Sequence, residues 1–266
     1  MIWWLIGGLL TAGGLADSKI ADFQRSAARD IAAVLDGPAK RVSVRVKVDG
    51  LFTLPTGALA SVRLQASKFS VSGIPLFCDA SRGKTAKIGA LNLELSDFVL
   101  RGLRIEKLTA SIPGCEYDLD VAKRDKIVRL AKSGAGPGAA TVRESDLAAF
   151  LLHKYRDFET VQVRLKSGHA FVKGRGKFGL FQSDFYVIAK LAPRDPRKID
   201  LSEATVFLDG SLVDPAASRA LLDSVNPVMD LDEDLGLHGA FDVAKIEVVE
   251  GEMRLVGQAR IPNRPE

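Results

Sequence analysis

The sequence predicts a mixed α+β protein in which a long antiparallel sheet packs against helices on one face. Apolar and polar residues alternate in roughly nine or ten segments, which is the period of half-buried strands. A helical period dominates one long segment near the N-terminus. No long helix alternates with each strand, which argues against a doubly wound parallel sheet. A long, curved sheet with an apolar inner face needs a cover, and the N-terminal helix is the obvious one.

The first sixteen residues form an apolar segment. Met1–Ala16 is rich in large apolar side chains and contains no charged one. A bilayer-spanning helix needs about 20 residues, whereas this length suits the apolar part of a signal peptide. Gly14 and Ala16 would occupy its cleavage positions. Because no basic residue precedes the segment, an uncleaved membrane anchor is the alternative. Both alternatives predict export or membrane association, and a buried core segment is the less favoured interpretation.

An amphipathic helix is predicted over residues 17–35. Its apolar side chains recur at spacings of three and four and form one stripe, and Gly37-Pro38 ends the pattern. Such a stripe contacts either a protein core or a bound ligand. The stripe comprises Ile20, Phe23, Ala27, Ile31 and Val34.

The body of the chain is dominated by strand patterns. Arg41–Val48 alternates valine with basic or polar residues, which places Val44 and Val46 on one apolar face. The same period returns along the chain, and residues 117–121 are also interpreted as a strand. Two final strands are joined by a turn at Glu250-Gly251. We expect residues 17–266 to form a single domain.

The second half of the chain contains a break and two short helices. Ser133–Gly138 is rich in glycine and predicts a flexible break. Thr141 and Glu144 have the spacing of a capping box, which predicts a helix that includes Phe150. Pro215 is expected to open the second short helix.

Charge is unevenly distributed along the chain. The net charge is only +4, yet Lys154–Lys198 carries 11 basic and 4 acidic residues, and Asp200–Glu252 carries 2 and 13. A basic segment can face anionic lipid headgroups or nucleic acid, or it can simply be a solvated surface. Aromatic residues do not interleave with the basic ones, which disfavours nucleic acid. The predicted partners are therefore a lipid and a membrane surface.

One glycine motif matches the spacing of a dinucleotide site. Gly174–Gly179 reads Gly-Arg-Gly-Lys-Phe-Gly, but a strand pattern follows it where that site requires a helix. The better interpretation is a hairpin with basic side chains. Lys173, Arg175 and Lys177 are candidates for contact with a lipid headgroup, and a solvated turn is the alternative.

No catalytic, metal or cofactor site is predicted. Asp230, Asp232 and Asp234 resemble the start of a calcium loop, but the required glycine and the closing glutamate are missing. The three histidines lack metal-ligand spacing, and no serine or cysteine lies in a nucleophile motif. Cys78 and Cys115 are an even pair that permits one disulfide in an exported protein, with two free thiols as the alternative.

The order of segments in the second half resembles a known family. The segments are Asp146–Leu151, Val161–Val163, Phe171–Gly174, Leu221–Leu231 and Val248–Gly257. This order resembles the bacterial LmeA-like phospholipid-binding family, which belongs with the tubular lipid-binding (TULIP) proteins. The resemblance implies a strongly curved antiparallel sheet wrapped around a long helix, with acyl chains between them. It also implies no catalytic residues and a location in the cell envelope, exported or membrane-anchored, on the periplasmic side.

These observations together predict non-catalytic binding or carriage of a phospholipid or a similar lipid. The alternatives are a scaffolding envelope protein with a dry core and, less favoured, an envelope hydrolase. From the apolar faces we expect eight side chains to line the lipid: Ile20, Phe23, Ile31, Val34, Val44, Val46, Phe150 and Phe185.

Overall fold

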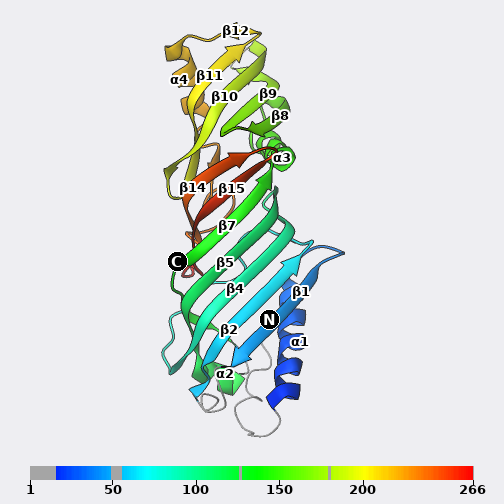
Figure 1. Cartoon of the computed structure of the whole chain (residues 1–266), viewed down its shortest axis with the longest axis vertical. Helices are drawn as coiled ribbons and strands as arrows, with labels where there is room; N and C mark the ends of the chain where they lie inside the picture. Colours follow the sequence, from blue (N-terminus) through cyan, green and yellow to red (C-terminus); the bar gives the residue numbers. More distant parts are fainter. Residues whose placement is uncertain (1–15, 49–55, 126–127, 179–180, 266) are drawn as a thin grey trace. The chain divides into compact units, whose positions relative to one another are not determined.

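A computed structural model describes residues 16–48, 56–125, 128–178 and 181–265 of the chain. It confirms a mixed α+β, strand-rich architecture in which the strands form strongly curved sheets (Figure 1). The contacts between residues divide the chain into two compact units. Unit 1 comprises residues 1–98, 108–138 and 258–266, and unit 2 comprises residues 99–107 and 139–257.

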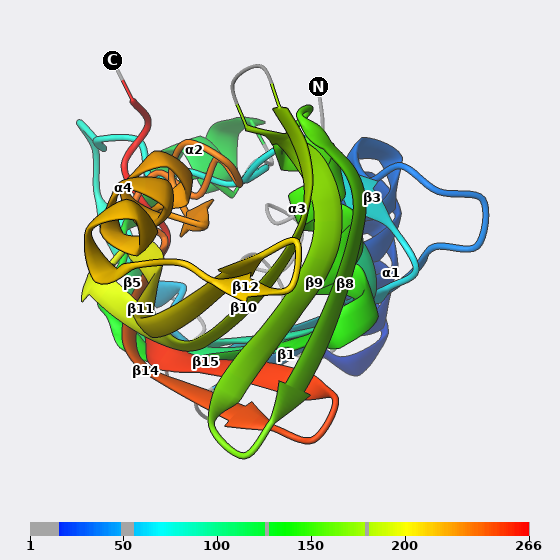
Figure 2. The same ribbon diagram turned by 90° about the horizontal axis from the view of Figure 1, so that it is seen from above.

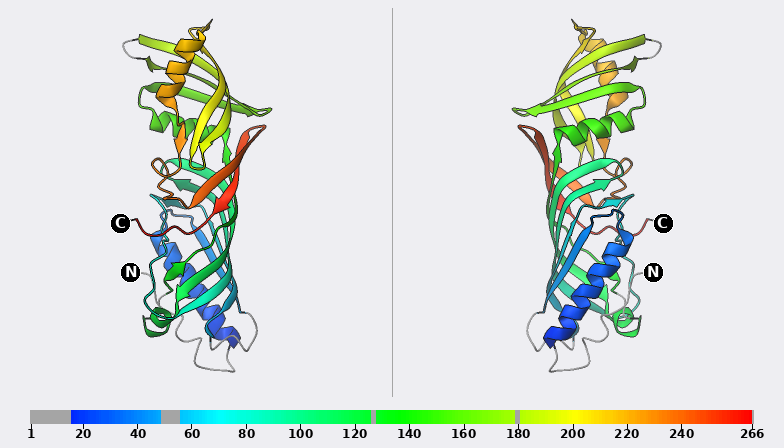
Figure 3. Two further views of the ribbon diagram at one scale, coloured as in Figure 1. Left: turned by 90° about the vertical axis from the view of Figure 1, so that its left-hand side faces the viewer. Right: turned by 90° about the vertical axis from the view of Figure 1, so that its right-hand side faces the viewer.

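Unit 1 is built on the strand order β1-β2-β4-β5, with β3 beside β4 and β6 beside β5. Its buried core includes Ile112 and Tyr117. Figure 3 shows helix α1 running alongside β1. The elements are α1 (Ala16–Val34), β1 (Arg41–Val48), β2 (Leu59–Ser67), β3 (Ser70–Val71), β4 (Thr85–Leu100), β5 (Leu103–Asp118), α2 (Leu119–Asp125) and β6 (Leu130–Lys132).

The helix predicted over 17–35 is thus present as α1. Its packing as the element around which the sheet wraps stays a prediction, because the side chains of its first turns lie outside the described residues. The predicted apolar segment 1–16 also lies outside them, apart from Ala16, where α1 begins. Within the described ranges we find no helical segment with the length and apolarity needed to cross a bilayer.

Three local expectations in unit 1 are wrong. β5 ends at Asp118 and helix α2 follows, because the Asp118 carboxylate accepts a hydrogen bond from the Val121 amide at 2.8 Å and so caps the helix. β2 and β4 pair in parallel, whereas β1 pairs with β2 and β5 with β6 in the expected antiparallel way. Residues 136–138 lie in strand β7, where a Cβ on Gly136 would approach the Ser111 carbonyl oxygen to 2.0 Å. Glycine there serves close strand pairing and not flexibility.

Unit 2 contains a second sheet with strand order β12-β11-β10-β9-β8, with β13 beside β11, and a group β7-β15-β14. Figure 2 shows β8 to β11 following a curve, with α4 beside β11. The elements are β7 (Gly136–Arg143), α3 (Glu144–Lys154), β8 (Phe158–Lys166), β9 (His169–Phe178), β10 (Phe181–Asp195), β11 (Lys198–Leu208), β12 (Ser211–Leu212), α4 (Pro215–Val225), β13 (Met229–Asp230), β14 (Phe241–Val249) and β15 (Glu252–Ala259).

The two short helices predicted in this half are confirmed as α3 and α4. The capping box predicted for α3 is wrong, because Arg143 occupies the N-cap position without a side-chain cap. The Glu144 carboxylate instead accepts a hydrogen bond from the Leu165 amide at 2.9 Å, which ties the start of α3 to β8. In α4, Asp214 caps the helix and Pro215 opens it, as that sequence predicts.

Candidate functional site

Unit 2 contains an apolar pocket between the concave face of its sheet and helices α3 and α4. It holds about 70 Å³ of empty space. Tyr155 provides the only polar side-chain atom among the lining residues. The lining comprises Leu147, Leu151, Tyr155, Phe158, Ala170, Val172, Phe185, Val187, Leu191, Leu201, Val206, Leu208, Leu221, Leu222, Val225 and Val228.

Strand alternation and one bulge direct the sheet side chains into the pocket. Val187 on β10 lies opposite Val172 of β9 and Val206 of β11. The register shifts between Ile188 and Lys190, because this step of β10 is matched by one residue more on β11, from Ser202 to Thr205. Within that stretch Glu203 adopts a φ of +48°. This bulge reverses the phase of β11, so Leu201 and Val206 both face the pocket although they are five residues apart.

A row of aromatic rings forms one wall of the pocket. The ring of Phe158 lies between those of Tyr155 and Phe185, at centroid distances of 5.1 and 4.9 Å. Glycines on β9 make room for two of these rings. A Cβ on Gly174 would lie 2.5 Å from Cζ of Phe185, and one on Gly176 would lie 2.9 Å from Cδ1 of Phe158. Gly174 and Gly176 therefore lie within strand β9 and make room for aromatic rings, and the expectation of a hairpin turn at these two glycines is wrong.

The two helices cover the pocket in different ways. Leu147 and Leu151 of α3 are buried at 4% and 7% exposure. Figure 3 shows α3 lying across one end of the unit 2 sheet and α4 running along its side. Leu221, Leu222 and Val225 of α4 face the pocket but remain only half-buried. The pocket-facing side chains of α3 are thus buried, whereas those of α4 are only half-buried.

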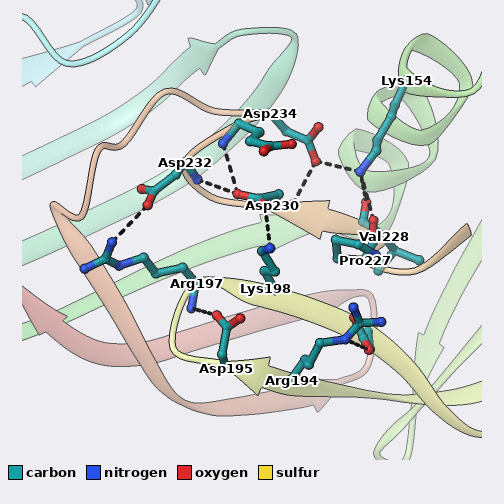
Figure 4. Close-up of polar contacts among 12 residues, drawn as sticks. Lys154, Arg194, Asp195, Arg197, Lys198, Pro227, Val228, Asp230, Asp232 and Asp234 are labelled. Atoms are coloured by element: carbon teal, nitrogen blue, oxygen red, sulfur yellow. Dashed lines mark hydrogen bonds and ion pairs between the residues drawn. The ribbon is translucent and has the colours of Figure 1, made fainter. Parts of the chain in front are cut away.

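Tyr155 and its neighbour Lys154 connect α3 to the end of α4. The Tyr155 hydroxyl donates a hydrogen bond to the Val225 carbonyl oxygen at 2.5 Å. Burial first, and then the Asp234 carboxylate, raise the pKa of Tyr155, so its hydroxyl stays a donor. The Lys154 ammonium donates to the carbonyl oxygen of Pro227 at 2.9 Å and to Asp234 Oδ2 at 2.6 Å (Figure 4). The one polar group of the lining is therefore already engaged.

The predicted lipid-lining residues do not gather at one place. Phe185 lines the pocket with 6% exposure. Phe150 is buried at 2% but is not part of the lining. In unit 1, Val44 is buried, Ile31 and Val46 are half-buried, and Val34 is 47% exposed. The side chains of Ile20 and Phe23 lie outside the described residues.

The predicted headgroup contacts lie on the outer face of β9. Lys173, Arg175 and Lys177 are exposed and alternate with Val172 and Gly174, whose positions face inward. Arg175 also lies 3.8 Å from the Asp184 carboxylate. Because neighbouring residues on a strand point to opposite faces, these three cations point away from the pocket. Their contact with a headgroup stays a prediction.

The two cysteines are free thiols, so the disulfide that the sequence permitted is not formed in this structure. Each sulfur is instead engaged by a backbone carbonyl oxygen, Cys78 with Ile261 at 3.6 Å and Cys115 with Ile112 at 3.7 Å. Burial first, and then Cys115 and Asp79, raise the pKa of Cys78 to about 11. Burial likewise raises the pKa of Cys115. Both thiols are therefore protonated and weakly reactive at neutral pH.

The aspartates that resemble a calcium loop hold their own loop in place (Figure 4). Asp230 Oδ1 accepts hydrogen bonds from the amides of Asp232 and Glu233, and Asp232 pairs with Arg197 at 3.1 Å. Asp234 accepts from Lys154. Among the described residues, no group of three or more His, Cys, Asp or Glu side chains is arranged to hold a metal ion.

Sequence reasoning missed most of the pocket. Apart from Phe185, its lining positions were expected only as generic apolar positions of strands and helices. The available signal for α4 was helical spacing: Val225 lies three and four residues after Leu222 and Leu221, which places all three on one face of the predicted helix. Tyr155 had no signal, because its role depends on the position of α4.

Comparison with known proteins supplies the chemical class of the ligand. A family model described as LmeA-like phospholipid-binding matches residues 87–258, which include every residue of the pocket lining. No curated protein and no solved structure matches the chain. The match covers more than half of the chain, and it confirms the resemblance noted from the sequence. The chain belongs to the LmeA-like phospholipid-binding family.

Proposed function

We propose that this protein binds phospholipid without chemical turnover, with an acyl chain held in the unit 2 pocket and the headgroup outside. The observation that carries this proposal is the apolar lining, which lies within the span matched by a phospholipid-binding family. Burying each methylene contributes about 0.8 kcal/mol, so hydrocarbon alone can supply the affinity. The site needs no polar anchor, and the Tyr155 hydroxyl is occupied by Val225.

We further propose that the protein acts at the cell envelope, exported or anchored through its N-terminus, where it carries or holds lipid. The uncharged apolar segment 1–16 supports this location. The family is a lipid-binding one and not a known enzyme family, which supports binding over catalysis. A scaffold with a dry core is the second candidate, and the small volume of the pocket favours it.

Lipid extraction and native mass spectrometry of the purified protein test the proposal, together with uptake of a pyrene-labelled phosphatidylcholine from vesicles. We compare two variants of α4, Leu222→Glu in the lining and Ala220→Glu at an exposed position of the same helix. Both add one negative charge, but only Leu222→Glu places it against the apolar pocket, where an unpaired charge is costly.

We expect wild type and Ala220→Glu to carry lipid and Leu222→Glu to lose it. Wild-type protein that is always lipid-free and takes up no labelled lipid would favour the scaffold. Equal binding by both variants would place the lipid elsewhere in the chain.

A further inference from the structure

We propose that Tyr155 acts as a latch on α4, and that this helix must leave the pocket at its C-terminal end before an acyl chain can enter. This inference rests on the proposed function and adds the control of access to the same site. It assigns Tyr155 a positioning role, exerted through the backbone of Val225.

The size of the pocket requires a wall to move. Its empty space is about 70 Å³. An apolar cavity of about 150 Å³ is the size that accommodates one benzene molecule. An acyl chain is several times larger than benzene, so it fits only if part of the lining is displaced.

Helix α4 is the wall most free to move. The sheet strands are held by continuous hydrogen-bond ladders, and the pocket-facing leucines of α3 are buried. In α4, Ser218 is the only buried residue. Within the described part of the chain, the hydrogen bonds that tie α4 to its surroundings lie at its two ends. The Val213 amide, before the helix, bonds the Val206 carbonyl oxygen at 3.0 Å.

The C-terminal end of α4 is held by side chains. Tyr155 bonds the Val225 carbonyl oxygen, one of the last of the helix, at 2.5 Å. The Asn226 side chain accepts from the Leu201 amide at 2.9 Å and donates to the Leu201 carbonyl oxygen at 3.1 Å. These contacts join α4 to α3 and to β11, the two elements between which the pocket lies. Breaking the Tyr155 contact loosens the helix end and leaves the sheet ladders intact, whereas breaking the Asn226 contact also frees the Leu201 amide and carbonyl at the edge of β11. Lys154 still holds the Pro227 and Val228 carbonyl oxygens, so the chain after α4 stays in place and can act as the hinge.

The latch predicts a specific kinetic pattern. One intramolecular hydrogen bond contributes about 1 kcal/mol, which shifts a two-state equilibrium by about fivefold, so Tyr155→Phe raises the open population by that factor. Uptake of lipid becomes about fivefold faster and the apparent affinity rises equally. The release rate stays unchanged, because α4 is already displaced while the chain is bound.

The experiment measures stopped-flow transfer of pyrene-labelled phosphatidylcholine from phosphatidylcholine vesicles to wild-type and variant protein. Tyr117→Phe is the control, because the Tyr117 hydroxyl in unit 1 also donates to a backbone carbonyl oxygen, that of Gly57 at 2.6 Å; Tyr117 is fully buried and Tyr155 half-buried, so this control loses at least as much hydrogen-bond energy. Asn226→Ala is a second latch variant. Hydrogen exchange of residues 215–225 is measured in each protein without lipid.

We expect Tyr155→Phe and Asn226→Ala to accelerate uptake and to raise exchange in 215–225, with Tyr117→Phe like wild type. Uptake and exchange in Tyr155→Phe equal to wild type would overturn the latch, as would equal changes in Tyr117→Phe. If no protein takes up lipid, the proposed function fails, but exchange still decides whether Tyr155 holds α4.

Discussion

Replacing Phe185 by alanine tests whether the unit 2 pocket is a ligand site or a packing defect. Phe185 is 6% exposed and its ring lies 4.9 Å from that of Phe158. A buried Phe→Ala substitution destabilises a protein by about 3–5 kcal/mol, of which about 1 kcal/mol is the aromatic pair. Without lipid we therefore expect the free energy of unfolding to fall by about 4 kcal/mol.

Added phospholipid should recover part of this loss. The space vacated by the ring adjoins the existing cavity and can hold roughly three methylenes, each contributing about 0.8 kcal/mol. Lipid should thus stabilise Phe185→Ala by about 2 kcal/mol more than it stabilises wild type. Chemical unfolding with and without a short-chain phosphatidylcholine measures the difference.

Phe98→Ala in unit 1 is the matched control. Phe98 is 3% exposed and stacks on Phe69 at a centroid distance of 5.0 Å, so the truncation costs a similar amount. Lipid should give Phe98→Ala no more stabilisation than wild type. If lipid fails to rescue Phe185→Ala, or rescues both variants alike, an acyl chain does not occupy this pocket.

Two further predictions concern packing and pH. Gly174→Ala should lower the free energy of unfolding by about 1–3 kcal/mol, because the new Cβ would lie 2.5 Å from Phe185 Cζ and overpack the wall. The same Cβ would lie 2.2 Å from the Thr160 carbonyl oxygen of β8, so unchanged chemical denaturation of this variant would show that both the ring and the β8 backbone have room to move. The hydrogen bond from Arg264 lowers the pKa of Asp79 below its ordinary value of 3.8. A carboxyl whose pKa is lower in the folded than in the unfolded protein stabilises the fold at every pH above its unfolded-state pKa. This stabilisation is lost as the pH falls through the folded-state pKa. We therefore expect unfolding below pH 3.8 to be less steep with pH in Arg264→Gln than in wild type, and equal acid profiles would contradict this coupling.

Local patterns predicted the elements whose signals lie within one segment. Alternating valines define β1 from Arg41 to Val48. Asp214 and Pro215 place the start of α4, because capping depends on neighbouring residues alone. The order of these segments also indicated the family that the comparison confirmed.

Patterns failed in two ways. Tyr117, Leu119 and Val121 alternate like a strand, but the Asp118 carboxylate caps a helix through the amide three residues on, so here one local signal overrode another. The second failure depended on a partner distant in sequence. Glu144 has capping-box spacing, yet its carboxylate bonds the amide of Leu165.

The sequence by itself determined an α+β protein with one-faced strands, the helices now seen as α1, α3 and α4, and membership of a phospholipid-binding family. These follow from periodicity, capping residues and segment order, which are all encoded locally. Only the tertiary structure decided which apolar residues share one pocket. The bulge at Glu203 turns Leu201 and Val206 to the same side, and the fold brings the Tyr155 hydroxyl to Val225. Strand register and helix packing set these distances, and neither is written in the spacing of residues along one segment.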